Sequence, residues 1–191
     1  VQHLTAFFNV GDHNNLRLED ADWNDGMDMA HDKGESVAFT ALYASNLKDL
    51  AELISQLDEE KLSFAVEMLP LFDTLTGAIN YTDPAVKRAH LTAYFDAVHG
   101  NVSGERVELS AQDIVSDLRS KADHLYAHLQ ENEWVQDDAG RGWFNGYYDN
   151  DGHPLEGSHP VNTRMTLTGQ VFPLMAEIAT DAQSRQIIQS A

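Results

Sequence analysis

The sequence contains no cysteine, few basic residues and no long apolar run. The absence of cysteine excludes disulfide bonds, zinc sites with thiolate ligands and thiol catalysis. No apolar stretch approaches the roughly 20 residues that a helix needs to cross a bilayer. There are 12 lysine and arginine residues against 31 aspartate and glutamate residues, a net charge of −19. This charge argues against binding to duplex nucleic acid or to an anionic membrane surface.

The rest of the composition is typical of a folded domain. At 191 residues, with 42% hydrophobic and 23% charged residues, the chain is long enough for one compact domain and too apolar for wholesale disorder. Residues 1–8 contain no methionine, no basic segment and no small-residue cleavage site. They therefore do not resemble a secretory signal, and we expect a cytoplasmic protein. We expect the abrupt apolar start to mark a piece of a longer polypeptide, with a processed or tagged chain as the alternative.

Two segments show clear helical periodicity. Over residues 35–57, large apolar residues recur every three or four positions, as on one face of a helix, and these are Phe39, Tyr43, Leu47, Leu50 and Ile54. Ser110 and Asp113 predict a capping box at the start of a second helix. Its apolar face is the clearest in the chain and consists of Ile114, Leu118, Ala122, Leu125 and Leu129.

The other helices are predicted from their ends. Asp83 and Pro84 suit an N-cap and a first helical position, and this helix should run to about His99, before Gly100. The apolar segment 59–79 is read as helical, with Pro70 kinking it or ending its first half.

The C-terminal third has a different character. Glycine, aspartate, asparagine and aromatic residues over 134–162 predict a long loop with one hairpin at 149–152. A last helical stretch begins near Gly169, with a break at Thr180 and Asp181. The fold class is therefore mostly α, with loops of functional character near each end. The aromatic group of Trp143, Phe144, Tyr147 and Tyr148 is read by composition as packing on the core, with a sugar platform as the alternative.

Residues 19–28 form the densest cluster of acidic groups. Four aspartates and one glutamate lie beside Trp23 within ten residues. Carboxylates beside a large aromatic ring are typical of carbohydrate sites, and a solvated acidic loop is the alternative. Asp20, Asp22 and Asn24 fit the first three ligand positions of an EF-hand calcium loop that begins at Asp20. Such a loop is disfavoured because its sixth position is Asp25 instead of glycine and its twelfth is His31 instead of glutamate.

Two motifs in this region resemble a known enzyme signature. Residues 22–27, Asp-Trp-Asn-Asp-Gly-Met, and residues 33–37, Lys-Gly-Glu-Ser-Val, have the order and spacing found in the family 94 glycoside phosphorylases. This family includes cellobiose, chitobiose and β-1,2-oligoglucan phosphorylases. The segments 143–152 and 169–172 resemble the loop and helix on the far side of the same catalytic barrel. The residues that flank the first motifs look most like the β-1,2-oligoglucan branch.

The resemblance implies a fold and a set of site residues. Residues 1–191 would be part of a single (α/α)6 barrel catalytic domain, and so a fragment of a longer chain. Asp25 would be the general acid and Trp23 would contact the donor sugar. Asp22, Arg17 and Gln170 complete the expected substrate-binding set, with Asp22 the second choice for the acid. Asp28 stands where the commonest family members have asparagine.

The implied reaction is inverting phosphorolysis of a β-linked gluco-oligosaccharide, with β-1,2 as one linkage, to an α-sugar 1-phosphate and a shortened sugar. Only an acid is needed, because inorganic phosphate is itself the nucleophile, so neither a cofactor nor a metal is expected. The partners would be the oligosaccharide, phosphate and the rest of the parent chain, which would supply the phosphate-binding residues, and a homodimer stays open. An inverting hydrolase on the same toroid and a non-catalytic carbohydrate-binding fragment are the alternatives. His124 and His128 are read as rim histidines and not as metal ligands.

Overall fold

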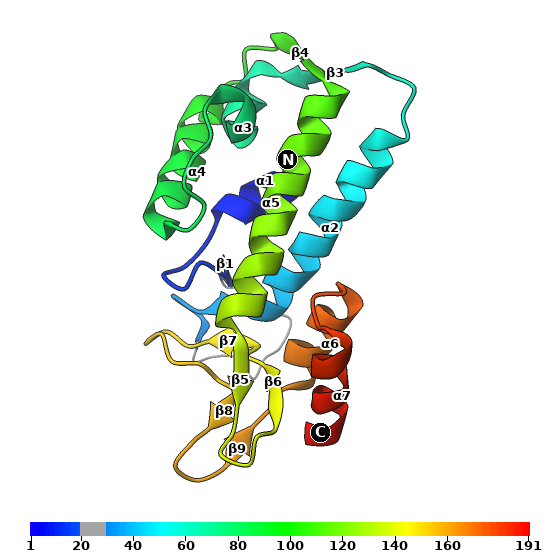
Figure 1. The fold of residues 1–191 in the computed structure, drawn as a ribbon. Coiled ribbons are helices and arrows are strands. Elements are labelled where there is room, and N and C mark those ends of the chain that lie inside the picture. Colours follow the sequence, from blue (N-terminus) through cyan, green and yellow to red (C-terminus); the bar gives the residue numbers. More distant parts are fainter. Residues whose placement is uncertain (20–29) are drawn as a thin grey trace.

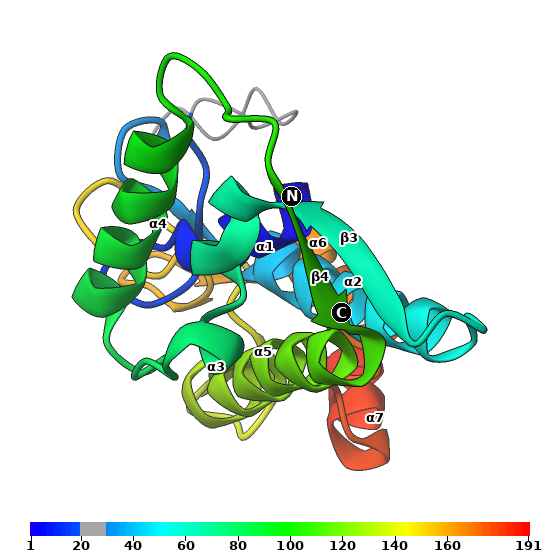
Figure 2. The ribbon, with the colours of Figure 1, turned by 90° about the horizontal axis from the view of Figure 1, so that it is seen from above.

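The computed structural model describes residues 1–19 and 30–191, and within them the fold is mostly α. Two long antiparallel helices, α2 (Val37–Ser55) and α5 (Ala111–Asn132), lie side by side along the molecule (Figure 1). The short helix α1 (Gln2–Phe8) contacts α2 and α4 (Pro84–Val98), and α4 lies on the far side of α1 from α2 (Figure 2). None of the helices in the described ranges is long and apolar enough to cross a membrane.

Helix α2 is confirmed, but its buried face differs from the predicted one. Ser36 caps the helix, because its side chain accepts a hydrogen bond from the N–H of Phe39 at 3.0 Å. Of the predicted apolar residues, Leu47 is fully buried and the other four are partly exposed. The fully buried apolar face is rich in small residues and consists of Val37, Ala38, Ala41, Ala44, Leu47 and Ala51. Small side chains let α5 pack closely against α2, a role that a search for large apolar residues does not detect.

Helix α5 is confirmed in both its start and its buried face. The Ser110 side chain accepts a hydrogen bond from the N–H of Asp113 at 3.3 Å. All five residues of its predicted apolar face are buried, at 3% exposure or less. The start of α4 is confirmed as well, because the Asp83 carboxylate accepts from the N–H groups of Ala85 and Val86.

The helical interpretation of residues 59–79 is wrong. This segment contains strand β3 (Lys61–Ala65), the 3-10 helix η2 (Val66–Leu71) and the single turn α3 (Asp73–Thr76). Strand β3 pairs antiparallel with β4 (Arg106–Ser110), which the sequence analysis did not identify. Leu62 and Phe64 alternate with exposed residues, as expected for a half-buried strand, and Pro70 lacks the N–H that an α-helix requires.

The C-terminal third contains more strands than the predicted loop and hairpin. Strand β5 (Trp134–Gln136) pairs with β6 (Gly142–Phe144), and β8 (Gly157–Ser158) pairs with β9 (Thr163–Arg164). Helices α6 (Leu167–Met175) and α7 (Asp181–Ser190) follow, and Thr180 forms a capping box at the predicted break. The packing interpretation is confirmed for Trp143, Phe144 and Tyr147, which are at most 1% exposed.

Four charged side chains lie in the core between α3, α4 and α5. Lys87, Lys121, Asp73 and Asp117 are all fully buried. The Lys121 Nζ donates to Asp73 Oδ1 and to Asp117 Oδ2, both at 2.6 Å. Buried charges need such partners because desolvation otherwise makes them costly.

Lys87 has fewer partners than Lys121. Its Nζ donates to Asn14 Oδ1 at 3.1 Å and lies 4.2 Å from the centre of the Phe7 ring. Burial, and secondarily the nearby positive charge of Lys121, lower the pKa of Lys87 to about 7. The buried amine of Lys87 therefore holds the side chain of Asn14. Because the charge of this amine changes near pH 7, its contribution to the free energy of unfolding depends on pH.

We expect Lys87→Met to change how stability depends on pH. Between about pH 7 and the unfolded lysine pKa of about 10.4, the unfolded chain binds a proton at Lys87 that the folded chain does not bind. The stability of the wild type relative to Lys87→Met should therefore rise with pH, by up to about 1.4 kcal/mol per unit. Urea unfolding of both proteins at pH 7, 8 and 9 measures this difference. His124 and His128, with pKa values lowered mainly by burial to about 3 and 4, do not titrate in this range. Parallel stability curves would contradict the prediction.

Candidate functional site

Three segments that are distant in sequence meet in one small sheet. Strand β2 (Glu35–Ser36) is central and pairs antiparallel with β1 (Leu16–Arg17) on one side and β7 (Tyr147–Tyr148) on the other. Glu35 stands opposite both Arg17 and Tyr148. The sheet therefore joins the segment before the acidic cluster, the Lys33-to-Val37 motif and the start of the loop 149–152.

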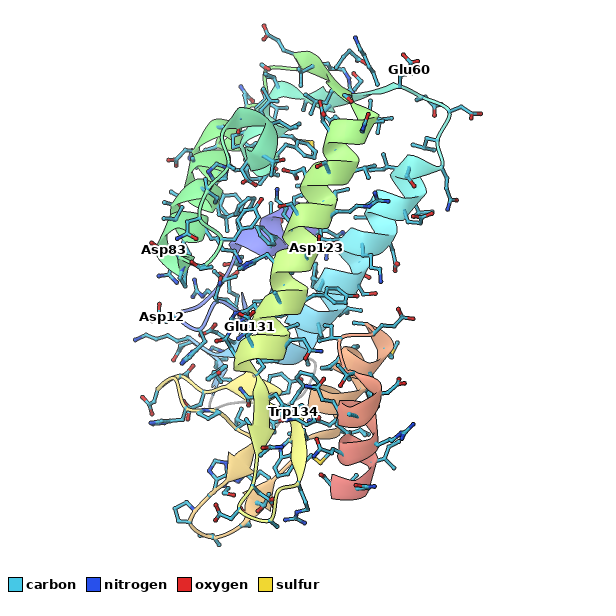
Figure 3. The ribbon with its side chains drawn as sticks, viewed as in Figure 1. Asp12, Glu60, Asp83, Asp123, Glu131 and Trp134 are labelled. Atoms are coloured by element: carbon cyan, nitrogen blue, oxygen red, sulfur yellow. The ribbon has the colours of Figure 1, made fainter. Side chains whose placement is uncertain are left out.

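A cavity of about 470 Å³ lies beside this sheet. Its volume is within the roughly 300–1,000 Å³ of ligand pockets. Asp12, on its rim, extends from the loop between α1 and β1 (Figure 3). The lining residues come from the three segments that the sheet joins, together with one residue of α4. They are Val10, Gly11, Asp12, His13, Arg17, Lys33, Glu35, Arg88, Asp149, Asn150, Asp151 and Gly152.

The cavity wall is built around the buried carboxylate of Glu35, which is 2% exposed. Its Oε1 accepts from the backbone N–H of His13 at 3.0 Å and from the His13 ring at Nδ1, at 2.8 Å. Its Oε2 accepts from the N–H of Asn15 at 3.0 Å. Gly11 allows this close approach, because a Cβ there would lie 2.2 Å from the Glu35 Cδ. Glu35 therefore fixes the loop 11–15 and the orientation of the His13 ring.

A second buried carboxylate, that of Glu133, supports the same loop from the end of α5. Its Oε1 accepts from the Asn15 amide at 2.6 Å, and its Oε2 accepts from the Tyr148 hydroxyl at 3.0 Å and from the Asn145 amide at 3.3 Å. Burial raises the pKa of Glu133, although these hydrogen bonds oppose the shift. Burial and the neighbouring Glu133 also raise the pKa of Tyr148, so its hydroxyl stays a donor. This network links the loop 11–15 to the end of α5 and to strand β7 at the base of the site.

Charges of both signs surround the cavity. The Arg88 guanidinium lies 3.2 Å from the Asp12 carboxylate, and the Arg17 guanidinium lies 3.3 Å from that of Glu19. The Asn150 side-chain oxygen accepts from the N–H of both Asp32 and Lys33, at 2.9 and 2.8 Å. This last contact ties the loop 149–152 to the motif 33–37.

The structure describes two of the five predicted site residues. Arg17 lines the cavity, which is compatible with substrate binding. Gln170 is buried in α6, where its amide accepts from the N–H of Phe144 at 2.9 Å and donates to the carbonyl of Phe144 at 2.8 Å. Both ends of this amide thus hold the backbone of the last residue of β6. Asp22, Trp23 and Asp25, together with Asp28, lie outside the described residues.

The predicted hairpin at 149–152 is confirmed, because the N–H of Asp149 donates to the carbonyl of His153 at 3.0 Å. Among the described residues, this turn also brings together three groups that could hold a metal ion. Asp149, Asp151 and His153 each offer a ligand atom within 4.8 Å of the others. Asp149 Oδ1, however, already accepts from the N–H groups of Asp151 and His153, at 2.9 and 2.8 Å. Because these are contacts of the turn itself, and Asp151 and His153 are exposed, the cluster alone does not identify a metal site.

His13, Asn15 and Glu35 were not among the predicted site residues, and a sugar contact of Tyr148 was only the alternative to core packing. His13 and Asn15 flank the recognised motif and Glu35 belongs to its second part, so the only available signal was their proximity to it. His124 lies beside a second cavity that also borders His13, as expected for a rim histidine. Neither a scan against protein-family models nor a search of curated proteins gives a match for this chain.

Proposed function

We propose that this chain is part of the catalytic domain of an inverting glycoside phosphorylase of family 94, with the (α/α)6 architecture of that family. One observation supports this most. The segments that resemble the family at 13–19, 33–37 and 147–152 are far apart in sequence, yet they form one sheet and line one cavity of about 470 Å³. Segments that matched a signature by chance would have no reason to meet around a cavity.

The proposed reaction is the phosphorolysis of a β-linked gluco-oligosaccharide. Asp25, as a carboxylic acid, donates its proton to the glycosidic oxygen while the bond from that oxygen to the anomeric carbon breaks. An oxygen of inorganic phosphate attacks the anomeric carbon from the opposite face. The products are an α-sugar 1-phosphate and a saccharide shortened by one unit. No cofactor or metal takes part in this scheme.

The described residues support substrate placement in this scheme. Arg17, on β1, lines the cavity and is proposed to donate hydrogen bonds to sugar hydroxyls. Gln170 holds the backbone of Phe144, so it is proposed to shape the substrate site through the loop that follows β6. Residues that bind phosphate are proposed to lie in the remainder of the parent chain.

We expect the complete protein to release sugar 1-phosphate from a β-linked gluco-oligosaccharide only when inorganic phosphate is added. Incubation with a β-1,2-linked disaccharide, with and without phosphate, followed by separate assays of sugar 1-phosphate and free glucose, measures this. Formation of free sugar at the same rate without phosphate would identify a hydrolase instead. Saccharide binding without any turnover would identify a non-catalytic binding domain.

A further inference from the structure

We propose that His13 contacts a sugar in the cavity through its Nε2 atom, and that Glu35 and Tyr148 position its ring for this contact. The identification of the ligand as a sugar depends on the proposed function. The role of His13 depends on the geometry of the cavity alone.

The His13 ring is held at one nitrogen and on one face. Its Nδ1 lies 2.8 Å from Glu35 Oε1, and a carboxylate oxygen accepts hydrogen bonds, so we assign the proton of this contact to Nδ1. The ring also stacks on Tyr148, with centroids 3.8 Å apart and planes 7° apart. A histidine fixed at one nitrogen and on one ring face has a defined direction for its other nitrogen.

The other ring nitrogen of His13, Nε2, lies at the edge of the cavity. The side chain of His13 is 35% exposed, although Glu35 beneath it is buried. Its Nε2 has no hydrogen-bond partner among residues 1–19 and 30–191. The Cε1 and Nε2 atoms face Gly152, which has φ +80° and closes the cavity on that side. Nε2 is therefore an oriented hydrogen-bonding atom at the edge of a ligand-sized cavity.

The charge of the cavity lining favours a neutral ligand over an anion. The described lining residues include three permanent cations, Arg17, Lys33 and Arg88, and four carboxylates, Asp12, Glu35, Asp149 and Asp151. The excess of carboxylates opposes binding of a phosphate dianion. A sugar hydroxyl both donates and accepts, so it can pair with His13 Nε2 and with the neighbouring arginine donors.

The test uses two substitutions that separate the two ring nitrogens. In His13→Asn, the side-chain amide can still donate to Glu35 from near the Nδ1 position, but the group at Nε2 is lost. In His13→Gln, the amide reaches toward the Nε2 position, but the donor to Glu35 is lost. His99→Asn, at the exposed end of α4, is the matched control.

We expect His13→Asn to raise KM for the saccharide about tenfold in the complete protein, as for the loss of one hydrogen bond. KM for phosphate and the thermal unfolding temperature should stay near the wild-type values. His13→Gln should retain more saccharide affinity than His13→Asn, and His99→Asn should behave as the wild type. An unchanged saccharide KM in His13→Asn would overturn the proposal while leaving phosphorolysis intact.

A binding measurement separates this proposal from the proposed function. The His13 ring signals in a long-range proton–nitrogen NMR spectrum should shift when a β-1,2-linked glucose disaccharide is added. They should not shift with inorganic phosphate alone. A shift with phosphate and none with the disaccharide would show that the cavity binds an anion, and would overturn the proposal. If the protein binds the disaccharide through His13 but produces no sugar 1-phosphate, only the proposed function fails.

Discussion

Asp25→Asn is expected to lower the kcat of phosphorolysis by about 10²–10⁴-fold, the usual contribution of a general acid. Asparagine has nearly the shape of aspartate but no acidic proton, so the leaving sugar would depart as an unprotonated alkoxide. The unfolding temperature should change little, because the substitution is nearly isosteric. Initial rates of sugar 1-phosphate release in the complete protein measure the effect.

Asp28→Asn is the matched control for this experiment. It makes the same chemical change three residues away, at a position where the commonest members of the resembled family have asparagine. Its phosphorolysis rate should stay close to that of the wild type. Near-normal turnover in Asp25→Asn would contradict the assignment, and a large loss in Asp22→Asn instead would transfer the role of the acid to Asp22.

The helices could be predicted where local sequence determines both their ends and their faces. Helix α5 has a serine cap and a regular series of large apolar residues, so its start and its buried face follow from the sequence alone. Helix α2 was predicted less well, because its fully buried face is made largely of alanines. These alanines are buried because α5 packs against α2, and that contact cannot be predicted from the sequence of α2 alone. Strand β3 was missed because five residues of alternating burial lie within a longer apolar segment, and its partner β4 is about 45 residues away.

The candidate site could be predicted only in part, for a similar reason. The motifs identified the segments that line the cavity, but the contacts between these segments depend on strand register. Glu35 reaches His13 and Asn15 because β2 pairs with β1, and it stands opposite Tyr148 because β2 also pairs with β7. A pattern search reads each segment separately, so it cannot find a carboxylate that supports a loop 22 residues away. Gln170 illustrates the converse, because a motif residue expected to bind substrate has its amide engaged with the backbone of Phe144.

The largest effect on stability is expected from Lys121→Met. Lys121 is fully buried, and its Nζ is 2.6 Å from both Asp73 Oδ1 and Asp117 Oδ2, which are themselves fully buried. Removing the Lys121 cation leaves two buried carboxylates without the ion-pair partner that both of them contact, which costs about 3–5 kcal/mol. That is a large part of the roughly 5–15 kcal/mol by which a domain is stable. Urea or thermal unfolding of the purified protein measures the loss.

Two further variants show whether the loss comes from uncompensated buried charge. Arg119→Met removes a cation from the same helix, but the Arg119 guanidinium is half exposed and 3.7 Å from Glu52, so the change should stay below about 1 kcal/mol. Adding Asp117→Asn to Lys121→Met removes one of the two orphaned charges and should recover part of the lost stability. Equal destabilisation by Lys121→Met and Arg119→Met, or a double variant less stable than Lys121→Met, would contradict this account. Recovery in the double variant would support this account. It would show that the lost stability comes from the unpaired charges in the core and not from the lost packing of the lysine side chain.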